Sequence, residues 1–323
     1  VCGGNVTSNG GGQVTARGVC WSTNENPTIS NSHTTNGTGT GSFTSNLTGL
    51  TENTTYYVRA YATNEAGTSY GINRSFTTYP AAPAGAINGL FSVSATKKIY
   101  FSQGNLQYQA STNTWRFAEN QYDFIGEDNT NISSTYSGWI DLFGGGTGDN
   151  PTNHSRDVND YSTFTDWGNN AISNGGNTPN QWRTLKETEW VYVFNTRNTI
   201  SGIRYAKATV NGINGMILVP DEWSSSYYSL RSTNNSEVDF SSNTISLSDW
   251  TTRLEANGAV FLPAAGNRLG TFVTVNSFGY YWSAPSGSTN NEYTMYFYNG
   301  GLSISMSLDR TNGLSVHLVR DAE

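Results

Sequence analysis

The fold is decided by the segment Phe278-Gly-Tyr-Tyr-Trp-Ser-Ala-Pro285 and the runs after it, Leu302-Ser-Ile-Ser-Met-Ser-Leu-Asp309 and Leu314-Ser-Val-His-Leu-Val-Arg320. Short runs rich in aromatic and branched residues, bounded by Gly, Asn and Ser, are typical of β-strands. We therefore predict three short strands. The first and last runs fix the two ends of the segment, and the residues between them are rich in Ser, Asn, Tyr and Gly. A rigid support with a polar, aromatic face indicates a binding surface rather than a catalytic site.

The middle run alternates strictly between apolar and polar residues. Successive side chains of a strand point to opposite faces, so one face should pack on a core and the other should meet solvent. The residues expected inside are Leu302, Ile304, Met306 and Leu308, and those expected outside are Ser303, Ser305, Ser307 and Asp309.

The mixture of Tyr and Ser in this segment resembles antibody paratopes, where Tyr supplies rigid contact area and Ser supplies adaptable hydrogen bonds. We therefore predict a ligand-binding face, and the alternative is a plain solvated face of an antiparallel sheet. The candidate ligand-binding residues are Tyr280, Ser286, Ser288, Asn290, Asn291, Tyr293, Tyr296, Tyr298, Asn299, Ser303, Ser305, Ser307, Asp309 and Thr311.

The composition favours a β-rich protein that works outside the cell. The chain has 323 residues, enough for two domains, and only 13% of them are charged. Nine Trp, nineteen Tyr and fourteen Phe supply ample core, which argues against disorder. The net charge of −7 and the lack of a basic run argue against a nucleic-acid partner. No apolar stretch is long enough to span a bilayer.

Residues 1–78 predict a small β-sandwich. Val14–Trp21 and Tyr56–Ala62 alternate with period two, and Leu50 precedes Tyr56 by six residues, which predicts a Tyr hydroxyl bonded back to the preceding corner. Residues 79–88, Pro- and Ala-rich, form the predicted linker, and the second domain is expected over residues 89–323.

The two cysteines, Cys2 and Cys20, both fall in the first domain. We expect them in neighbouring strands, where they would form either a disulfide or two buried thiols. Because the sequence opens inside an apparent strand, we also expect that upstream residues, including a first strand and an export signal, are missing from it.

The second domain predicts an α+β fold, with many short strands and few helices. Two helices are expected. The first spans Thr184–Phe194, with Thr184 as its cap and an apolar stripe. The second spans Ser246–Gly258, with Ser246 as its cap and Gly258 as its stop. Its apolar face should hold Leu247, Trp250 and Leu254. Residues 126–180 should be long loops, which are usually functional or held by ions.

No catalytic constellation emerges from the sequence, and we predict neither a cofactor nor a metal. The one suggestive cluster joins His154 to Asp149, Asp157 and Asp160, but it lacks the spacing of a known calcium loop. We interpret it as a solvated polar loop, with a structural metal as the alternative. We expect His317 to be half-buried, Trp190 and Trp282 to be core residues, and Arg268 and Arg320 to pair with buried carboxylates or carbonyls.

The first domain resembles a fibronectin type III domain, an immunoglobulin-like β-sandwich common in surface proteins of gut bacteria. The resemblance implies a spacer, and a ligand site on the sandwich is the less favoured alternative. The matching stretches are Gly3-Gly-Asn-Val-Thr7, Ala16-Arg-Gly-Val-Cys-Trp-Ser22, Gly41-Ser-Phe43, Leu47-Thr-Gly-Leu50, Tyr56-Tyr-Val-Arg-Ala-Tyr-Ala-Thr-Asn64 and Gly67-Thr-Ser-Tyr-Gly71.

The second domain resembles the "major paralogous" surface domain of gut bacteria, a branch of the C-type lectin-like fold. Formylglycine-generating enzymes share this fold, but their catalysis needs cysteines, and none follows Cys20. The branch includes proteins diversified by retroelements, and residues 280–320 lie where their variable stretch would be. The matching stretches are Gln181-Trp-Arg-Thr-Leu-Lys-Glu-Thr-Glu-Trp190, Phe261-Leu-Pro-Ala-Ala-Gly-Asn-Arg268, Tyr281-Trp-Ser-Ala284 and Gly313-Leu-Ser-Val-His-Leu-Val-Arg320.

These resemblances imply an extracellular adhesin or recognition protein, carried on a cell surface, a pilus tip or a phage tail. Its ligand would be a glycan or a protein. The rival hypotheses are a structural surface module without its own ligand and, less favoured, a hydrolase of envelope polysaccharides.

Overall fold

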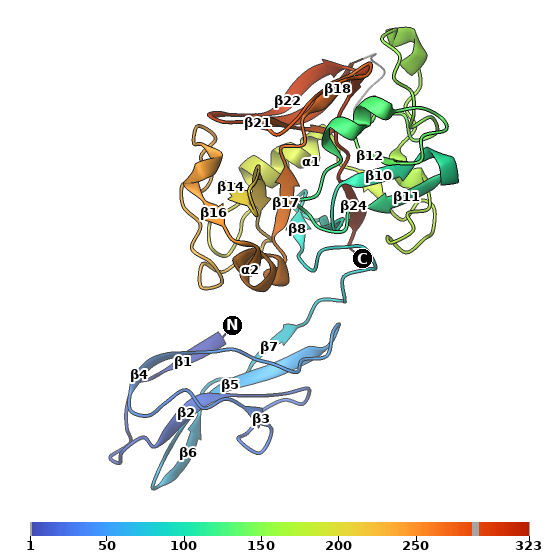
Figure 1. Ribbon diagram of the computed structural model, residues 1–323. Helices are drawn as coiled ribbons and strands as arrows, with labels where there is room; N and C mark the ends of the chain where they lie inside the picture. The colour runs from blue at the N-terminus through green and yellow to red at the C-terminus, as the bar shows by residue number, and fades with distance from the viewer. Residues whose placement is uncertain (1, 286–290, 323) are drawn as a thin grey trace. The chain divides into compact units, whose positions relative to one another are not determined.

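The computed structural model describes residues 2–285 and 291–322. The protein is β-rich, and its strands gather into several small sheets that are almost entirely antiparallel (Figure 1). The chain divides into two compact units, Val1–Ala81 and Ala82–Glu323.

The N-terminal unit contains two antiparallel sheets. One pairs β1 (Cys2–Val6) with β4 (Gly41–Ser45). The strands of the other are β3 (Ser32–His33), β2 (Ala16–Ser22), β5 (Thr55–Asn64), β6 (Gly67–Tyr70) and β7 (Arg74–Thr77). Val19, Trp21 and Tyr56 form the buried centre of this unit. The two alternating runs predicted from the sequence are strands β2 and β5.

The predicted corner at Tyr56 is confirmed. The backbone N–H of Thr51 donates to the Tyr56 hydroxyl over 2.9 Å. This bond fixes the chain where it enters β5, because it ties the loop to the ring at the start of the strand.

The disulfide hypothesis is wrong, because Cys2 and Cys20 are both free thiols and lie in strands of different sheets. Cys2 is half-buried, and its thiol donates to the carbonyl of Ser45. Cys20 is fully buried, and its thiol donates to the carbonyl of Pro27 over 3.2 Å. Each cysteine therefore serves as a small packing residue with a weak donor.

The C-terminal unit holds five further sheets in the part of the chain that the structure describes. Three of them contain three or four strands each and supply many of the buried core residues. They comprise β8 (Phe91–Ser92), β9 (Lys98–Phe101), β24 (Leu318–Asp321) and β13 (Arg183–Thr184); β10 (Leu106–Gln109), β11 (Thr114–Phe117) and β12 (Trp139–Ile140); and β14 (Tyr205–Val210), β15 (Ile213–Leu218), β16 (Thr244–Ile245) and β17 (Val260–Pro263). The fourth comprises β18 (Asn267–Leu269), β19 (Phe272–Thr274) and β23 (Asn312–Gly313), and the fifth contains the candidate ligand face.

Helices are few and short. The α-helices are α1 (Glu187–Val191) and α2 (Leu247–Asp249), which continue as the π-turns η5 (Tyr192–Thr196) and η7 (Trp250–Leu254). The 3₁₀ turns are η1 (Ala110–Thr112), η2 (Gly126–Asn131), η3 (Val158–Tyr161), η4 (Trp167–Asn169), η6 (Phe240–Ser242) and η8 (Glu255–Asn257). The core positions expected on the first helix, Leu185, Trp190, Val193 and Phe194, are all fully buried.

The predicted cap at Thr184 is wrong. Thr184 lies in β13, and its N–H and hydroxyl both donate to the carboxylate of Asp166. The helix begins instead after Lys186, whose N–H donates to the Glu189 side chain over 2.9 Å. The capping interaction therefore falls two residues later than the sequence spacing predicts.

The second helix has the predicted ends. The N–H of Asp249 donates to Ser246 Oγ over 3.1 Å, and Gly258 ends the segment with φ of +82°. Trp250 and Leu254 are buried, but Leu247 is 42% exposed, so its predicted place on the apolar face is wrong. Leu247 is the first residue of the helix, where the apolar face has not yet turned toward the core.

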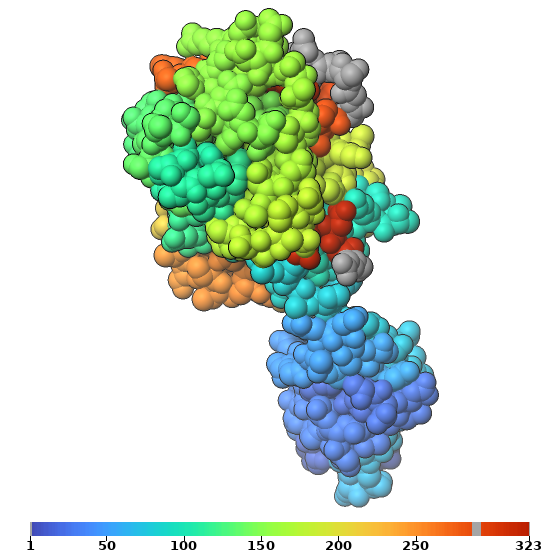
Figure 2. All heavy atoms as spheres, turned by 90° about the vertical axis from the view of Figure 1, so that its right-hand side faces the viewer, coloured from blue at the N-terminus to red at the C-terminus, as the bar shows by residue number. Residues whose placement is uncertain are grey.

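Apart from the two-residue strand β12, residues 126–180 form loops with short 3₁₀ turns, as predicted, and they cover much of one face of the C-terminal unit (green to yellow-green in Figure 2). Side-chain hydrogen bonds hold them in place. Asn129 Nδ2 donates to Asp141 Oδ1 over 2.8 Å, and the N–H of Asp141 donates back to Asn129 Oδ1 over 3.0 Å. Both residues are fully buried, and burial raises the pKa of Asp141 to about 6.

Among the described residues, no helix combines the length and the apolar character needed to cross a membrane.

Candidate functional site

The candidate ligand face is the outer side of the sheet β20 (Phe278–Trp282), β21 (Asn291–Tyr298) and β22 (Gly301–Asp309). Figure 1 labels β21 and β22 at the edge of the C-terminal unit. The predicted alternation of β22 is confirmed. Ser303, Ser305, Ser307 and Asp309 are exposed, and the apolar residues between them are half-buried. On the inner side, Leu302 and Ile304 pack against one core cluster and Leu308 against another.

A register shift between Thr294 and Tyr296 gathers the tyrosines of β21 on the outer side. Thr294 and Met295 are both buried, so the in–out alternation changes phase at this point. Tyr293 before the shift and Tyr298 after it are therefore both exposed, each at 38%. A β-bulge commonly redirects side chains in this way.

Four aromatic rings form a continuous cluster on this face. Tyr280 and Tyr296 are cross-strand partners whose ring centroids lie 4.4 Å apart with planes inclined by 20°. The rings of Tyr296 and Tyr298 follow at 5.3 Å and 22°. Phe278 completes the cluster, 6.0 Å from Tyr296 and 6.3 Å from Tyr298. Offset stacking of this kind stabilises a pair of rings beyond their burial, by about 0.5–1.5 kcal/mol.

Tyr280 and Tyr296 stay protonated at neutral pH. Burial raises the pKa of Tyr280, against a hydrogen bond with Tyr296 that lowers it. Burial also raises the pKa of Tyr296, and the neighbouring phenols of Tyr280 and Tyr298 raise it further. Each phenol is therefore a neutral group that can both donate and accept a hydrogen bond.

Two residues set the position of Tyr298. Gly301 lies opposite it on β22, and a Cβ atom added there would stand 2.2 Å from Tyr298 Cε1, so the ring rests over the glycine. Lys207 is fully buried on β14, and its Nζ donates to the carbonyls of Ser236 and Tyr298, the latter over 2.5 Å. Burial lowers the pKa of Lys207 to about 8.

A buried ion pair lies beneath the exposed tyrosines. Glu292 Oε1 and Arg310 Nε are 3.0 Å apart, and Arg310 also donates to the carbonyl of Tyr161 over 2.9 Å. Burial raises the pKa of Glu292 to about 8, although the Arg310 charge opposes this shift. The pair joins the end of β22 to the start of β21 on the inner side, and nothing in the sequence spacing signals it.

The structure brings most of the predicted ligand-binding residues together. Tyr280, Tyr293, Tyr296, Tyr298, Ser303, Ser305, Ser307 and Asp309 share the outer face. Phe278 joins them without having been predicted, although its spacing of two residues from Tyr280 carries the signal. Asn299 is exposed in the turn between β21 and β22, where its Oδ1 accepts from the N–H of Phe240 over 3.1 Å.

Thr311 must be removed from the predicted set, because it is 5% exposed and lies past the end of β22. Its N–H donates to Asp309 Oδ1, which closes the turn after the strand. Asn291 pairs with Asp309 through the backbone of β21. Ser286, Ser288 and Asn290 lie outside the described residues.

His317 is not half-buried as predicted but 2% exposed. Its ring nitrogens lie 3.0 Å from Asn105 Oδ1 and 3.1 Å from the Ser102 carbonyl, and burial lowers its pKa to about 3. Arg268 is also buried and donates to the carbonyls of Leu142 and Gly270, as predicted. The predicted core residues Trp190 and Trp282 are buried.

The loop around His154 shows none of the features of a metal site. His154 is exposed, and its Nδ1 lies 3.0 Å from the carbonyl of Thr152. Within residues 2–285 and 291–322, no three His, Cys, Asp or Glu side chains lie close enough to share a metal ion.

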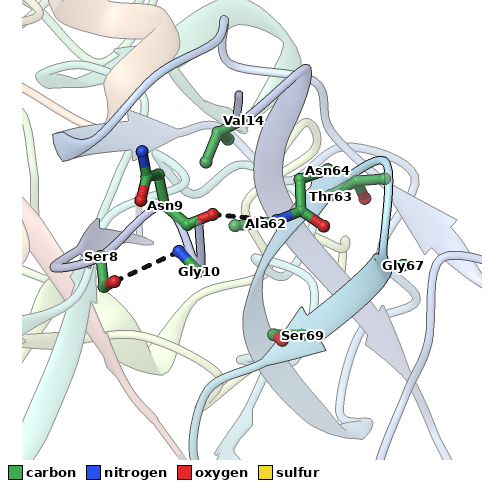
Figure 3. Close-up of a pocket in the computed structure, with 9 residues that line it drawn as sticks. All are labelled: Ser8, Asn9, Gly10, Val14, Ala62, Thr63, Asn64, Gly67 and Ser69. Atoms are coloured by element: carbon green, nitrogen blue, oxygen red, sulfur yellow. Dashed lines mark hydrogen bonds between the residues drawn. The ribbon is translucent and has the colours of Figure 1, made fainter. Parts of the chain in front are cut away.

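Two hollows lie on the N-terminal unit, and neither contains a predicted binding residue. One of about 220 Å³ is lined by Ser8, Asn9, Gly10, Val14, Ala62, Thr63, Asn64, Gly67 and Ser69 (Figure 3). Within it, the Asn64 amide donates to the carbonyl of Asn9 over 2.9 Å. A second hollow of about 240 Å³ lies beside Phe43 and Tyr70. Neither hollow has the stacked cluster of four rings found on the sheet β20–β22, so that face is the better candidate.

Comparisons of the chain with models of protein families, with curated proteins and with solved structures found no match.

Proposed function

We propose that the protein is an extracellular recognition or adhesion protein that binds its ligand through the outer face of the sheet β20–β22. In this proposal the N-terminal unit is a fibronectin type III-like spacer and the C-terminal unit is a C-type lectin-like binding head. The ligand lies on another cell or surface, and the protein is displayed on a cell surface, a pilus or a virion.

One observation carries the proposal. A contiguous set of aromatic rings and hydroxyls faces solvent on a sheet whose other side is anchored in the core. An aromatic ring that stays exposed forgoes the free energy that burial of its apolar area would contribute. Isolated exposed rings are ordinary, but a stacked cluster of four rings on one rigid face, with Tyr298 exposed and the other three half-buried, is typical of an interaction site.

The supporting sheet is rigid enough to hold such a site. Trp282 and Phe297 lie in the same strands as the exposed rings and are buried in the core. Lys207 and the Glu292–Arg310 pair tie the two ends of the β21–β22 hairpin to the body of the unit. A face held in this way is pre-organised, so little conformational entropy is lost on binding.

The test uses binding of the labelled protein to panels of fixed bacterial and epithelial cells, measured by flow cytometry. We expect the wild type to bind at least one cell type, and the double variant Tyr296→Ala/Ser305→Arg to bind at least tenfold less. The control, Ser225→Arg, places the same charge at an exposed position off the sheet and should bind like the wild type.

Circular dichroism must show that the double variant remains folded. Absence of binding to every cell type, or equal binding by the wild type and the double variant, would refute the proposal. It would instead favour a structural surface module without its own ligand.

A further inference from the structure

Tyr298 presents the most accessible ring of the cluster. Its ring rests over Gly301, which has no side chain to displace it, and stacks against Tyr296 on one side. With 38% of the residue exposed, the remaining ring surface faces solvent. The ring of Tyr298 therefore offers an apolar surface about one ring wide, and the neighbouring cross-strand pair on the same face is Tyr296 with Ser303.

The outer face carries almost no charge. Among its described side chains only Asp309 has a carboxyl group, at one end, and one of its oxygens already accepts the N–H of Thr311. Two cations near this sheet, Lys207 and Arg310, are both buried and bonded to backbone carbonyls. An acidic ligand would therefore find no counter-charge on the described face, and a basic ligand would find one carboxylate.

The size of the face favours a small ligand. With strands about 4.8 Å apart and a rise of about 3.3 Å per residue, three strands of up to nine residues cover about 400 Å². A stable protein partner covers about 800 Å² on each side. A short oligosaccharide fits within the outline of the sheet, whereas a protein partner of that size would also need contacts beyond it.

We infer that the ligand is a neutral carbohydrate, whose sugar ring packs its C–H face on the ring of Tyr298. This inference rests on the proposed function. A pyranose has one largely apolar face and a rim of hydroxyls, which matches a flat aromatic surface bordered by neutral hydroxyls. The rim hydroxyls bond to the phenols and to Ser303 and Ser305, each of which both donates and accepts.

The first experiment is affinity gel electrophoresis of the full chain in gels containing one polysaccharide each. The neutral probes are starch, mannan, xylan and galactan, and the acidic probes are heparin and polygalacturonate. We expect at least one neutral polysaccharide to retard the wild type and neither acidic one to do so. Tyr298→Ala should weaken the retardation at least tenfold, whereas Tyr298→Phe, which keeps the ring, should retain most of it.

Gly301→Ala tests the position of the ring without removing any ligand-facing group. The backbone of Gly301 does not have the positive φ that favours glycine, so alanine is tolerated there. The added methyl must displace the exposed Tyr298 ring, and we expect about a tenfold loss of binding. Ile200→Ala, at an exposed site off the sheet, is the control and should bind like the wild type.

The second experiment separates this inference from the proposed function. The fixed cells are treated either with periodate, which cleaves sugar diols, or with a protease. Binding lost after periodate supports a carbohydrate ligand. Binding that survives periodate but is lost after protease overturns the carbohydrate and leaves recognition through this face intact. Failure to bind untreated cells and every neutral polysaccharide overturns both.

Discussion

His317 is a histidine without a charge. Its ring is enclosed in the core between Phe101 and Tyr281, and its two nitrogens lie close to Asn105 Oδ1 and the Ser102 carbonyl oxygen, to one of which the single N–H of the neutral ring donates. Burial penalises the imidazolium, so the ring stays neutral far below the pH at which a free histidine is protonated. The role of His317 is therefore to join β24 to the segment after β9, not to transfer protons.

His317 predicts a pH dependence of folding stability. Its pKa is about 3 in the folded state and near 6.5 when unfolded. Between these values only the unfolded chain binds the proton, so the wild type loses stability as pH falls, by up to about 1.4 kcal/mol per pH unit. His317→Gln lacks this loss. Urea titrations from pH 7.5 to pH 4 should show the free energy of unfolding falling faster in the wild type than in the variant.

The comparison must be made between the variant and the wild type, because Asp141 and Glu292 act in the opposite direction. Their raised pKa values make the folded state bind protons more readily, so their contribution falls as pH rises. His154→Gln is the control, since that histidine is exposed. The prediction would be contradicted if the free energy of unfolding changed with pH in the same way for the wild type and His317→Gln.

At the scale of elements, the second helix depends on a single cap. Ser246 Oγ accepts the N–H of Asp249, and α2 and η7 together extend only from Leu247 to Leu254. We expect Ser246→Ala to lower the free energy of unfolding by about 1 kcal/mol. Chemical denaturation followed by tryptophan fluorescence measures the loss. The neighbouring Ser248→Ala should change it little, and equal effects of the two variants would argue against the cap.

Elements with a local signal could be predicted from the sequence. The alternation of Leu302–Asp309 and the cap and stop of the second helix depend on neighbouring residues, and the structure contains all three. The first helix begins later than predicted because Asp166, eighteen residues upstream, takes the donors of Thr184. The burial of His317 likewise depends on residues more than 200 positions away.

The candidate face was predictable in composition but not in arrangement. Period two placed Tyr296 and Tyr298 together, yet the register shift that adds Tyr293 to the same side has no local signal. Gly301 and Lys207 could not be found either, because their importance lies in what they contact across the sheet and from another strand. Long-range packing of this kind overrides local pattern.

At the scale of the whole molecule, two units have separate cores. Val19, Trp21 and Tyr56 belong to one core cluster, and every residue of the other three clusters lies after residue 85. We expect calorimetry to show two unfolding transitions. Tyr56→Phe removes the acceptor of the Thr51 N–H. It should lower the stability of the N-terminal unit by about 1 kcal/mol and leave the transition of the C-terminal unit unchanged.

Ser246→Ala should instead destabilise the C-terminal unit and leave the transition of the N-terminal unit unchanged. Tyr57→Phe, next to Tyr56, is the control for the ring substitution. A single transition that both Tyr56→Phe and Ser246→Ala displace would mean that the units unfold together.

Because β22 alternates, the residues that would contact a ligand are different from those that hold the strand on the core. Substitutions at solvent-facing positions typically change stability by no more than about 0.5 kcal/mol. Positions 303 and 305 are such positions, while Leu302, Ile304 and Leu308 keep the strand attached to the core. Selection can therefore test new side chains at these two sites without first acquiring a compensating mutation, which allows the binding specificity of the face to evolve while the fold is kept.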